Sequence, residues 1–180
     1  MFYPNSQLDQ KVGFIFYPGG KVEHLAYAPM LTQLSNHGIT CVLVKMPLNL
    51  AVFNINAADS IKENFDDIDT WYIGGHSLGG AMASSYIEGK GDQYSGLILM
   101  GAYPINTEDI KTLAIYGSED MGLDLEKLES TANTHEISGG NHAYFGNYGE
   151  QAGDGIASMS REEQQTITVQ LVSDFINSNE

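Results

Sequence analysis

The remaining segments of the chain are arranged around the stretch Ile73-Gly74-Gly75-His76-Ser77-Leu78-Gly79-Gly80-Ala81. Gly75, Ser77 and Gly79 match the G-x-S-x-G pattern of a nucleophile elbow, in which a strand ends, a tight turn carries serine at its tip and a helix begins. Glycine is needed on both sides because the serine backbone is strained and the strand and helix pass too close for a Cβ atom. Because short patterns also arise by chance, the surrounding chain must decide whether this one is meaningful.

The composition is that of a single globular domain. The chain has 180 residues, of which 42% are hydrophobic, so we expect one domain with a sizeable core over residues 1–180. Its formal net charge is −15 and it has only 8 lysines and arginines in total. Nucleic acids and anionic membranes are therefore not expected partners, and we attribute the acidity to solubility.

Cysteine content and hydropathy set the expected environment. The single cysteine, Cys41, rules out an internal disulfide and a cysteine-based zinc cluster, and its apolar neighbours indicate a small buried core residue. The first residues do not resemble a secretion signal, and no stretch approaches the roughly 18 apolar residues of a membrane-spanning helix. We expect a cytoplasmic protein that is a monomer or a small homo-oligomer.

Short apolar runs alternate with segments of helical spacing along the whole chain. Strands are predicted at residues 12–17, 39–45, 70–74, 96–100 and 113–116, with a weaker one at 135–138. Helices are predicted at residues 22–36, 57–65, 77–88, 123–132 and 161–177. The alternation predicts an α/β fold, a three-layer α/β/α sandwich with a mostly parallel sheet of about six strands. In such sheets ligands bind at the carboxyl ends of the strands, where Ser77 lies.

Two later turns supply partners for Ser77. A serine hydroxyl is a poor nucleophile until a base takes its proton, and a histidine base works best when a carboxylate holds its tautomer. On this kind of sheet the order along the chain is serine, acid, histidine. Asp120 and Glu119 compete for the acid, and we favour Asp120 because it lies farther along its turn and has the shorter side chain. The histidine is His142, in the glycine-rich loop after the weak strand.

The other histidines are interpreted as structural. His37 lies at a helix end, His24 at a surface or mouth position, and His135 opens a strand. His76 directly precedes Ser77, so its side chain should point away from the serine side chain.

The chemistry also needs backbone N–H groups aimed at the oxygen that becomes negative. One is expected from Leu78, where the dipole of the following helix adds to the effect. The other is expected from the loop Pro18-Gly19-Gly20-Lys21. We prefer Gly20, and Lys21, one residue further on, is the alternative. The other possibility is that Pro-Gly-Gly is simply a turn with no role in the chemistry.

These motifs resemble those of the α/β-hydrolase superfamily, specifically its small lidless members akin to the dienelactone-hydrolase branch. The elbow, Gly117-x-x-Asp120 and Gly139-Gly140-Asn141-His142 match the superfamily's serine, acid and histidine motifs in order and spacing. The resemblance covers nearly the whole chain, from Phe14 to the last helix, and implies a minimal version of that fold. Dienelactone hydrolases use cysteine as the nucleophile, whereas position 77 is serine, so a dienelactone substrate does not follow.

Two loops are candidates for lining the site. The segment 46–56 is unusually apolar for a connection and either lines an acyl pocket or packs on the core. Tyr144, Phe145 and Tyr148 follow His142 and either form a wall of the mouth or serve packing. With so little sequence between the strands, no lid domain is expected. No metal-ligand spacing or phosphate-binding loop is present, so we predict neither metal nor cofactor.

The sequence therefore predicts a serine hydrolase that cleaves a small carboxylic ester, thioester or lactone through a Ser77–His142–Asp120 triad and an acyl-enzyme. Its expected partner is the small-molecule substrate. One alternative is a ligand-binding protein that keeps the fold with little or no turnover. Another is the same triad acting on amides or as an acyltransferase.

Overall fold

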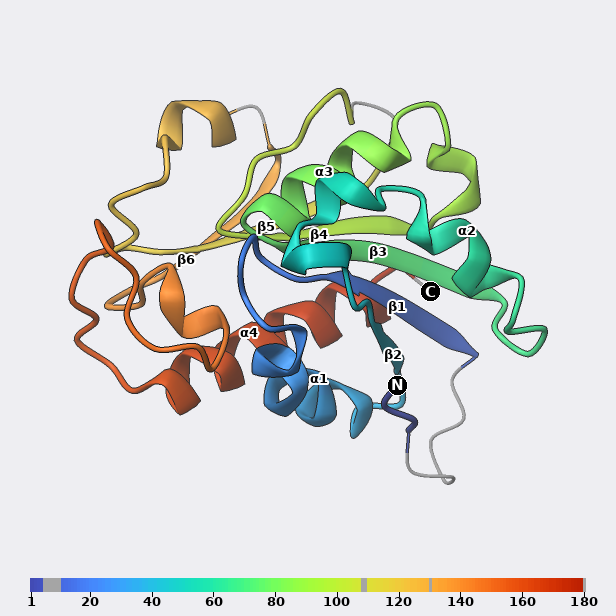
Figure 1. Ribbon diagram of the computed structural model, residues 1–180, viewed down its shortest axis with the longest axis horizontal. Helices are drawn as coiled ribbons and strands as arrows, with labels where there is room; N and C mark the ends of the chain where they lie inside the picture. The colour runs from blue at the N-terminus through green and yellow to red at the C-terminus, as the bar shows by residue number, and fades with distance from the viewer. Residues whose placement is uncertain (5–10, 108–109, 130, 180) are drawn as a thin grey trace.

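The computed structural model describes residues 1–4, 11–107, 110–129 and 131–179. In these residues one sheet of six parallel strands is formed by β1 (Val12–Tyr17), β2 (Thr40–Leu43), β3 (Thr70–His76), β4 (Gly96–Met100), β5 (Thr112–Gly117) and β6 (Asn133–Ile137). Their order across the sheet is β2-β1-β3-β4-β5-β6 (Figure 1). The predicted parallel sheet of about six strands is confirmed.

Helices cover both faces of the sheet. α1 (Ala28–Ser35) and α4 (Arg161–Asn177) lie on one face, and α2 (Ala57–Lys62) and α3 (Leu78–Ile87) lie on the other (Figure 1). Side chains of β1 alternate between the two layers, because Phe14 packs in the core beneath α1 and α4 while Ile15 packs in the core beneath α2 and α3. Both faces of β1, β3 and β4 are buried, which explains the continuous apolar runs of these strands, and the helices on both sides of the sheet confirm the three-layer sandwich.

Two predicted helices differ from the observed structure. The first, predicted over 22–36, begins as the 3₁₀ turn η1 (His24–Tyr27), and α1 starts only at Ala28. Pro29 explains this boundary, because proline is accommodated in the first turn of an α-helix but not in its interior. The helix predicted over 123–132 is wrong, since its described part contains the 3₁₀ turn η5 (Leu125–Leu128), in which Leu128 alone is buried. One buried side chain does not stabilise a longer helix.

The last helix begins as predicted. The Ser160 hydroxyl accepts from the Glu163 N–H (3.2 Å), and the Glu163 carboxylate accepts from the Ser160 N–H (2.8 Å). This capping box satisfies donors that the helix itself leaves unpaired. It also fixes the position of Gln164 in the same turn, which is fully buried.

The carboxyl ends of all six strands lie along one edge of the sheet, at the left in Figure 1. The connections at this edge include the turns η2 (Pro47–Asn49), η3 (Ala51–Phe53) and η6 (Ala143–Phe145), and in the described chain none of them carries a separate lid domain. At the other end of the strands Cys41 is fully buried, and burial raises the pKa of its thiol. Among the described residues, no helix combines the length and apolar character needed to cross a bilayer.

Candidate active site

Ser77 lies in a strained turn between β3 and α3. Its φ of 53° and ψ of −124° are rare for a residue with a side chain. The Ser77 N–H donates to the Met100 carbonyl at the end of β4 (2.9 Å), which holds the turn against the neighbouring strand. A Cβ atom on Gly75 or Gly79 would overlap the Tyr17 carbonyl oxygen. The glycines on both sides of Ser77 are therefore required by the close approach of β1, as the sequence predicted.

Asp120 and His142 are in direct contact. His142 Nδ1 lies 2.7 Å from Asp120 Oδ2, and the Asp120 side chain is completely buried. The other carboxylate oxygen accepts from the Gly122 N–H (3.1 Å), which fixes its orientation. Because Nδ1 faces a carboxylate, we assign the imidazole proton to Nδ1, which leaves Nε2 as the basic nitrogen.

Glu119, the alternative acid, has a different partner. Its carboxylate accepts from the Ser118 hydroxyl (3.1 Å). The structure therefore brings Asp120 rather than Glu119 to His142.

The histidine loop is held by groups to which the sequence analysis assigned no role. The Asp154 carboxylate accepts from the backbone N–H groups of His142 (3.1 Å) and Ala143 (2.8 Å). Gln164 on α4 exchanges two hydrogen bonds with the Asn141 backbone, at 3.0 Å and 2.7 Å. Asp154 acts through backbone groups and lies twelve positions beyond His142, so its role is visible only in three dimensions.

His142 lies next to the elbow. Its ring is 4.5 Å from the ring of His76, the residue before Ser77. Gly101, which follows β4, backs the pair, since a Cβ atom there would lie 2.9 Å from His142 Nδ1 and 3.3 Å from Asp120 Oδ2. Within the described residues, however, no hydrogen bond joins the Ser77 hydroxyl to His142. Such bonds often form only when substrate is bound. In this structure Asp120 and His142 are paired and Ser77 lies in the adjoining turn.

In the loop after β1, the backbone N–H groups of Gly19 and Lys21 are engaged and that of Gly20 has no acceptor among the described residues. The Gly19 N–H donates to the Tyr27 hydroxyl (3.1 Å), and the Lys21 N–H donates to the Asn49 carbonyl (2.7 Å). A Cβ atom on Gly20 would lie 2.7 Å from Leu78 Cδ2, so Gly20 faces the start of α3. No acceptor for the Gly20 or Leu78 N–H is present among the described residues. This arrangement favours Gly20 over Lys21 as the donor.

His76 links that loop to the histidine. Its Nδ1 lies 2.8 Å from the Tyr27 hydroxyl, which already accepts the Gly19 N–H, so we assign Tyr27 as donor to Nδ1. The His76 side chain is fully buried, and burial together with the neighbouring His142 lowers the pKa of His76 well below 6.5. His76 is therefore a neutral group that is hydrogen-bonded to Tyr27 and packed against the His142 ring.

Two of the aromatic residues after His142 have different surroundings. Phe145 is fully buried with its ring 5.5 Å from that of His76, so its role is packing. Tyr148 lines a pocket of about 550 Å³ beside the loop after β1, together with Lys21, Val22, Glu23, Leu25, Ala26 and Asn147. The packing interpretation is confirmed for Phe145, whereas a role of Tyr148 at the mouth of the site stays a prediction.

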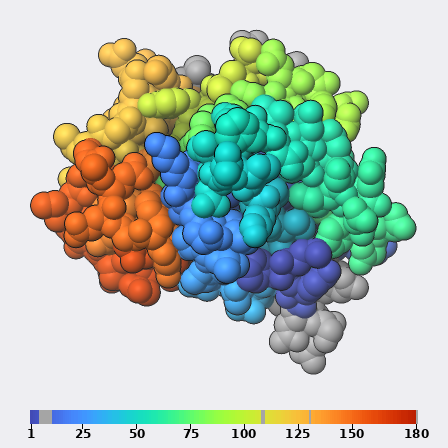
Figure 2. Space-filling view, in the orientation of Figure 1, coloured from blue at the N-terminus to red at the C-terminus, as the bar shows by residue number. Residues whose placement is uncertain are grey.

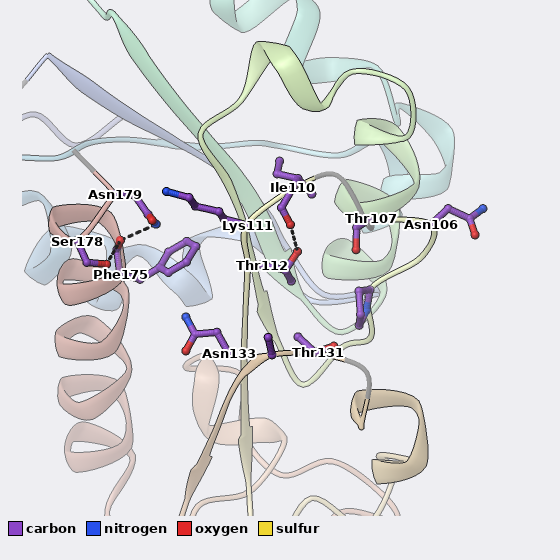
Figure 3. A pocket seen from close by; sticks show the side chains of 12 residues that line it. Asn106, Thr107, Ile110, Lys111, Thr112, Thr131, Asn133, Phe175, Ser178 and Asn179 are labelled. Carbon is purple, nitrogen blue, oxygen red and sulfur yellow. Dashed lines mark hydrogen bonds between the residues drawn. The ribbon is translucent and has the colours of Figure 1, made fainter.

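A second pocket lies away from this chemistry. Figure 3 shows a pocket of about 540 Å³ at the start of β5 and β6 and the end of α4, with Thr112, Asn133 and Phe175 among its lining residues. It is at the amino ends of the strands, opposite the edge that carries Ser77. In the part of the chain that the structure describes, no group of three or more His, Cys, Asp or Glu side chains is placed to hold a metal ion.

Comparison with known proteins agrees with this architecture. Residues 13–166 match the model of the alpha/beta hydrolase family, so the chain belongs to that family. The resemblance drawn from the sequence motifs is thereby confirmed. No curated protein sequence matches the chain.

Solved structures with the same fold are distant in sequence. The monoacylglycerol lipase of Paleococcus ferrophilus superposes with a TM-score of 0.70 at 13% identity, covering 97% of each chain. ClbQ from the colibactin NRPS/PKS pathway has a TM-score of 0.64 at 12% identity, covering 94% of this chain and 98% of its own. Est1E from Butyrivibrio proteoclasticus has a TM-score of 0.63 at 14% identity, covering 98% of this chain and 89% of its own. At these identities the likeness establishes the fold alone.

The crowding around the elbow predicts a large effect of one methyl group. Gly79→Ala should lower the free energy of unfolding by about 3 kcal/mol or more, because the new Cβ meets backbone that cannot move aside. Gly122→Ala is the matched control, since the nearest atom to its Cβ is Asp120 Oδ1 at an ordinary 3.6 Å. Urea unfolding followed by circular dichroism compares the two. Equal stabilities would contradict the close approach of β1 to the elbow.

Neutral, buried His76 predicts a pH dependence of stability. As the pH falls below 6.5, His76 binds a proton in the unfolded chain but not in the folded one, so stability is lost. The contribution is at most about 1.4 kcal/mol per pH unit. His76→Gln should flatten this slope in urea unfolding between about pH 7 and pH 5.5, whereas His135→Gln, at an exposed position on β6, should not. An unchanged slope in His76→Gln would show that His76 is not held neutral.

Proposed function

We propose that the protein is a serine hydrolase that cleaves a small carboxylic ester, thioester or lactone. The observation that carries the proposal is the buried Asp120–His142 hydrogen bond beside a serine in the strained elbow conformation. A histidine that acts as a general base needs a carboxylate on Nδ1 and a basic Nε2. A histidine with a purely structural role needs neither. Cleavage by this class of site requires neither a metal nor a cofactor.

In the first half of the reaction the serine is acylated. His142 Nε2 takes the proton of the Ser77 hydroxyl while Ser77 Oγ bonds to the carbonyl carbon of the substrate. The Asp120 carboxylate stabilises the imidazolium that forms. The tetrahedral intermediate then collapses, His142 returns the proton to the leaving oxygen or sulfur, and the acyl group remains on Ser77.

Two backbone donors stabilise the negative oxygen of the tetrahedral intermediate. The N–H groups of Gly20 and Leu78 are the proposed donors, because Gly20 faces Leu78 while the N–H groups of its neighbours Gly19 and Lys21 are engaged. Leu78 is the first residue of α3, so the helix dipole has the favourable sign. One such donor contributes about 3 kcal/mol to stabilising the transition state in comparable sites.

In the second half water releases the acyl group. His142 Nε2 removes a proton from water, the hydroxide oxygen bonds to the acyl carbon, and the Ser77 oxygen leaves with the proton from His142. The net reaction consumes one water and yields a carboxylic acid and an alcohol or thiol, or a single hydroxy acid when the substrate is a lactone. The name of the Paleococcus neighbour, a monoacylglycerol lipase, supports ester cleavage as an analogy of fold only.

Hydrolysis of p-nitrophenyl acetate tests the assignment. Ser77→Ala should lower kcat/KM by about 10⁴-fold, because the reaction then has no nucleophile to acylate. Ser85→Ala, a serine replacement on the same helix, should keep the wild-type rate. A Ser77→Ala rate within about tenfold of wild type would overturn the proposal.

A further inference from the structure

The loop after β2 presents apolar side chains to solvent beside the proposed oxyanion donors. Leu48 is 81% exposed, Phe53 58% and Val52 48%. Met46 and Ala51 of the same loop are buried and anchor its backbone. The exposed side chains of Leu48, Val52 and Phe53 therefore project from an anchored loop. We call Leu48, Val52 and Phe53 the acyl platform.

The platform is joined to the loop that carries Gly20. The Asn49 carbonyl accepts the Lys21 N–H (2.7 Å), and Leu50 Cδ2 would lie 3.6 Å from a Cβ atom on Gly20. Figure 2 shows the two loops side by side, the loop after β1 in blue and the loop after β2 in cyan. A substrate whose carbonyl oxygen is bound by Gly20 is therefore within reach of the platform.

The backbone of the platform is strained where its most exposed side chain lies. Leu48 and Asn49 have φ values of 51° and 55°, in the left-handed region. This conformation is tolerated by asparagine but is unfavourable for leucine. Burial of the side chain would offset the cost, yet Leu48 lies almost entirely in solvent. Backbone strain of this kind is characteristic of sites that contact a ligand. Here the strained residue is Leu48, whose exposed side chain is an alkyl group.

The position of the leaving group determines which part of the substrate contacts the platform. His142 gives its proton to the leaving group, so the leaving group lies toward the loop after β6. The platform follows β2, at the opposite end of the sheet. In Figure 2 the blue loop lies between the cyan platform segment and the orange segment after His142. The acyl chain therefore extends over the platform.

We propose that the acyl platform binds the aliphatic chain of the acyl group, so that the substrates are uncharged esters or thioesters of aliphatic acids longer than acetate. Residues 46–58 contain no charged side chain, in a protein of net charge −15, which fits an aliphatic acyl chain. The inference rests on the proposed serine hydrolase, and it adds the class of acyl group and the residues that select it.

Chain-length dependence is the expected signature. Burying one methylene completely is worth about fourfold in binding, and contact with one open face is worth about half of that free energy, or about twofold. The wild-type kcat/KM for p-nitrophenyl esters should therefore rise by about twofold per methylene from acetate through butyrate and hexanoate to octanoate, measured below micelle-forming concentrations.

Leu48→Asn separates substrate contact from a structural role. Asparagine suits the left-handed backbone, so the variant should be at least as stable as wild type in urea unfolding. Its octanoate-to-acetate ratio of kcat/KM should fall about tenfold, and Phe53→Ser should lower the same ratio. Ile167→Asn is the matched control, because Ile167 is an exposed apolar residue on α4, and it should keep the wild-type ratio.

The outcomes distinguish the two proposals. A fall in the ratio for Leu48→Asn and Phe53→Ser, with Ile167→Asn unchanged, supports the acyl platform. Ser77-dependent hydrolysis with the same rate for acetate and octanoate, or with an unchanged ratio in both platform variants, overturns the platform and leaves the hydrolase. Hydrolysis that survives Ser77→Ala overturns both.

Discussion

There is no room for a Cβ atom between the end of β1 and the elbow, and the geometry around Ser77 follows from this close approach. The Tyr17 carbonyl occupies the volume that side chains at Gly75 and Gly79 would need. With glycine at both positions, β1, β3 and α3 come together, Ser77 takes its left-handed φ and the start of α3 faces Gly20. One close approach thus places both the serine and the two backbone donors.

Asp120 and His142 are held by the loops after β5 and β6, at the end of the strand order opposite β2. Asp120 follows β5 and His142 follows β6, and Asp154 and Gln164 hold the histidine loop through its backbone. His76 and Tyr27 connect this part of the site to the loop after β1, since they join the Gly19 N–H to the surroundings of His142. The loops that carry Gly20 and His142 are therefore linked by the hydrogen bond between Tyr27 and neutral His76 and by the packing of the His76 ring against His142.

Apolar strands and their turns were predictable from the sequence because burial on both faces leaves a continuous signal. The contact between Asp120 and His142 could be predicted because chain order on a parallel sheet determines which turns meet. Asp154 could not, because it acts on backbone groups and any carboxylate at that distance would look the same. The choice between Gly20 and Lys21 depended on the Asn49 carbonyl, a contact between separate loops. The helix predicted over 123–132 failed because its apolar residues are not buried together, which spacing alone does not show.

If Ser77 is an activated nucleophile, its hydroxyl reacts covalently with a fluorophosphonate, and labelling with this probe measures that reactivity directly. We expect one adduct per chain, mapped by peptide mass spectrometry to Ser77, formed far more slowly in His142→Gln and at no serine in Ser77→Ala. An unlabelled wild-type protein, or an adduct on another residue, would contradict it.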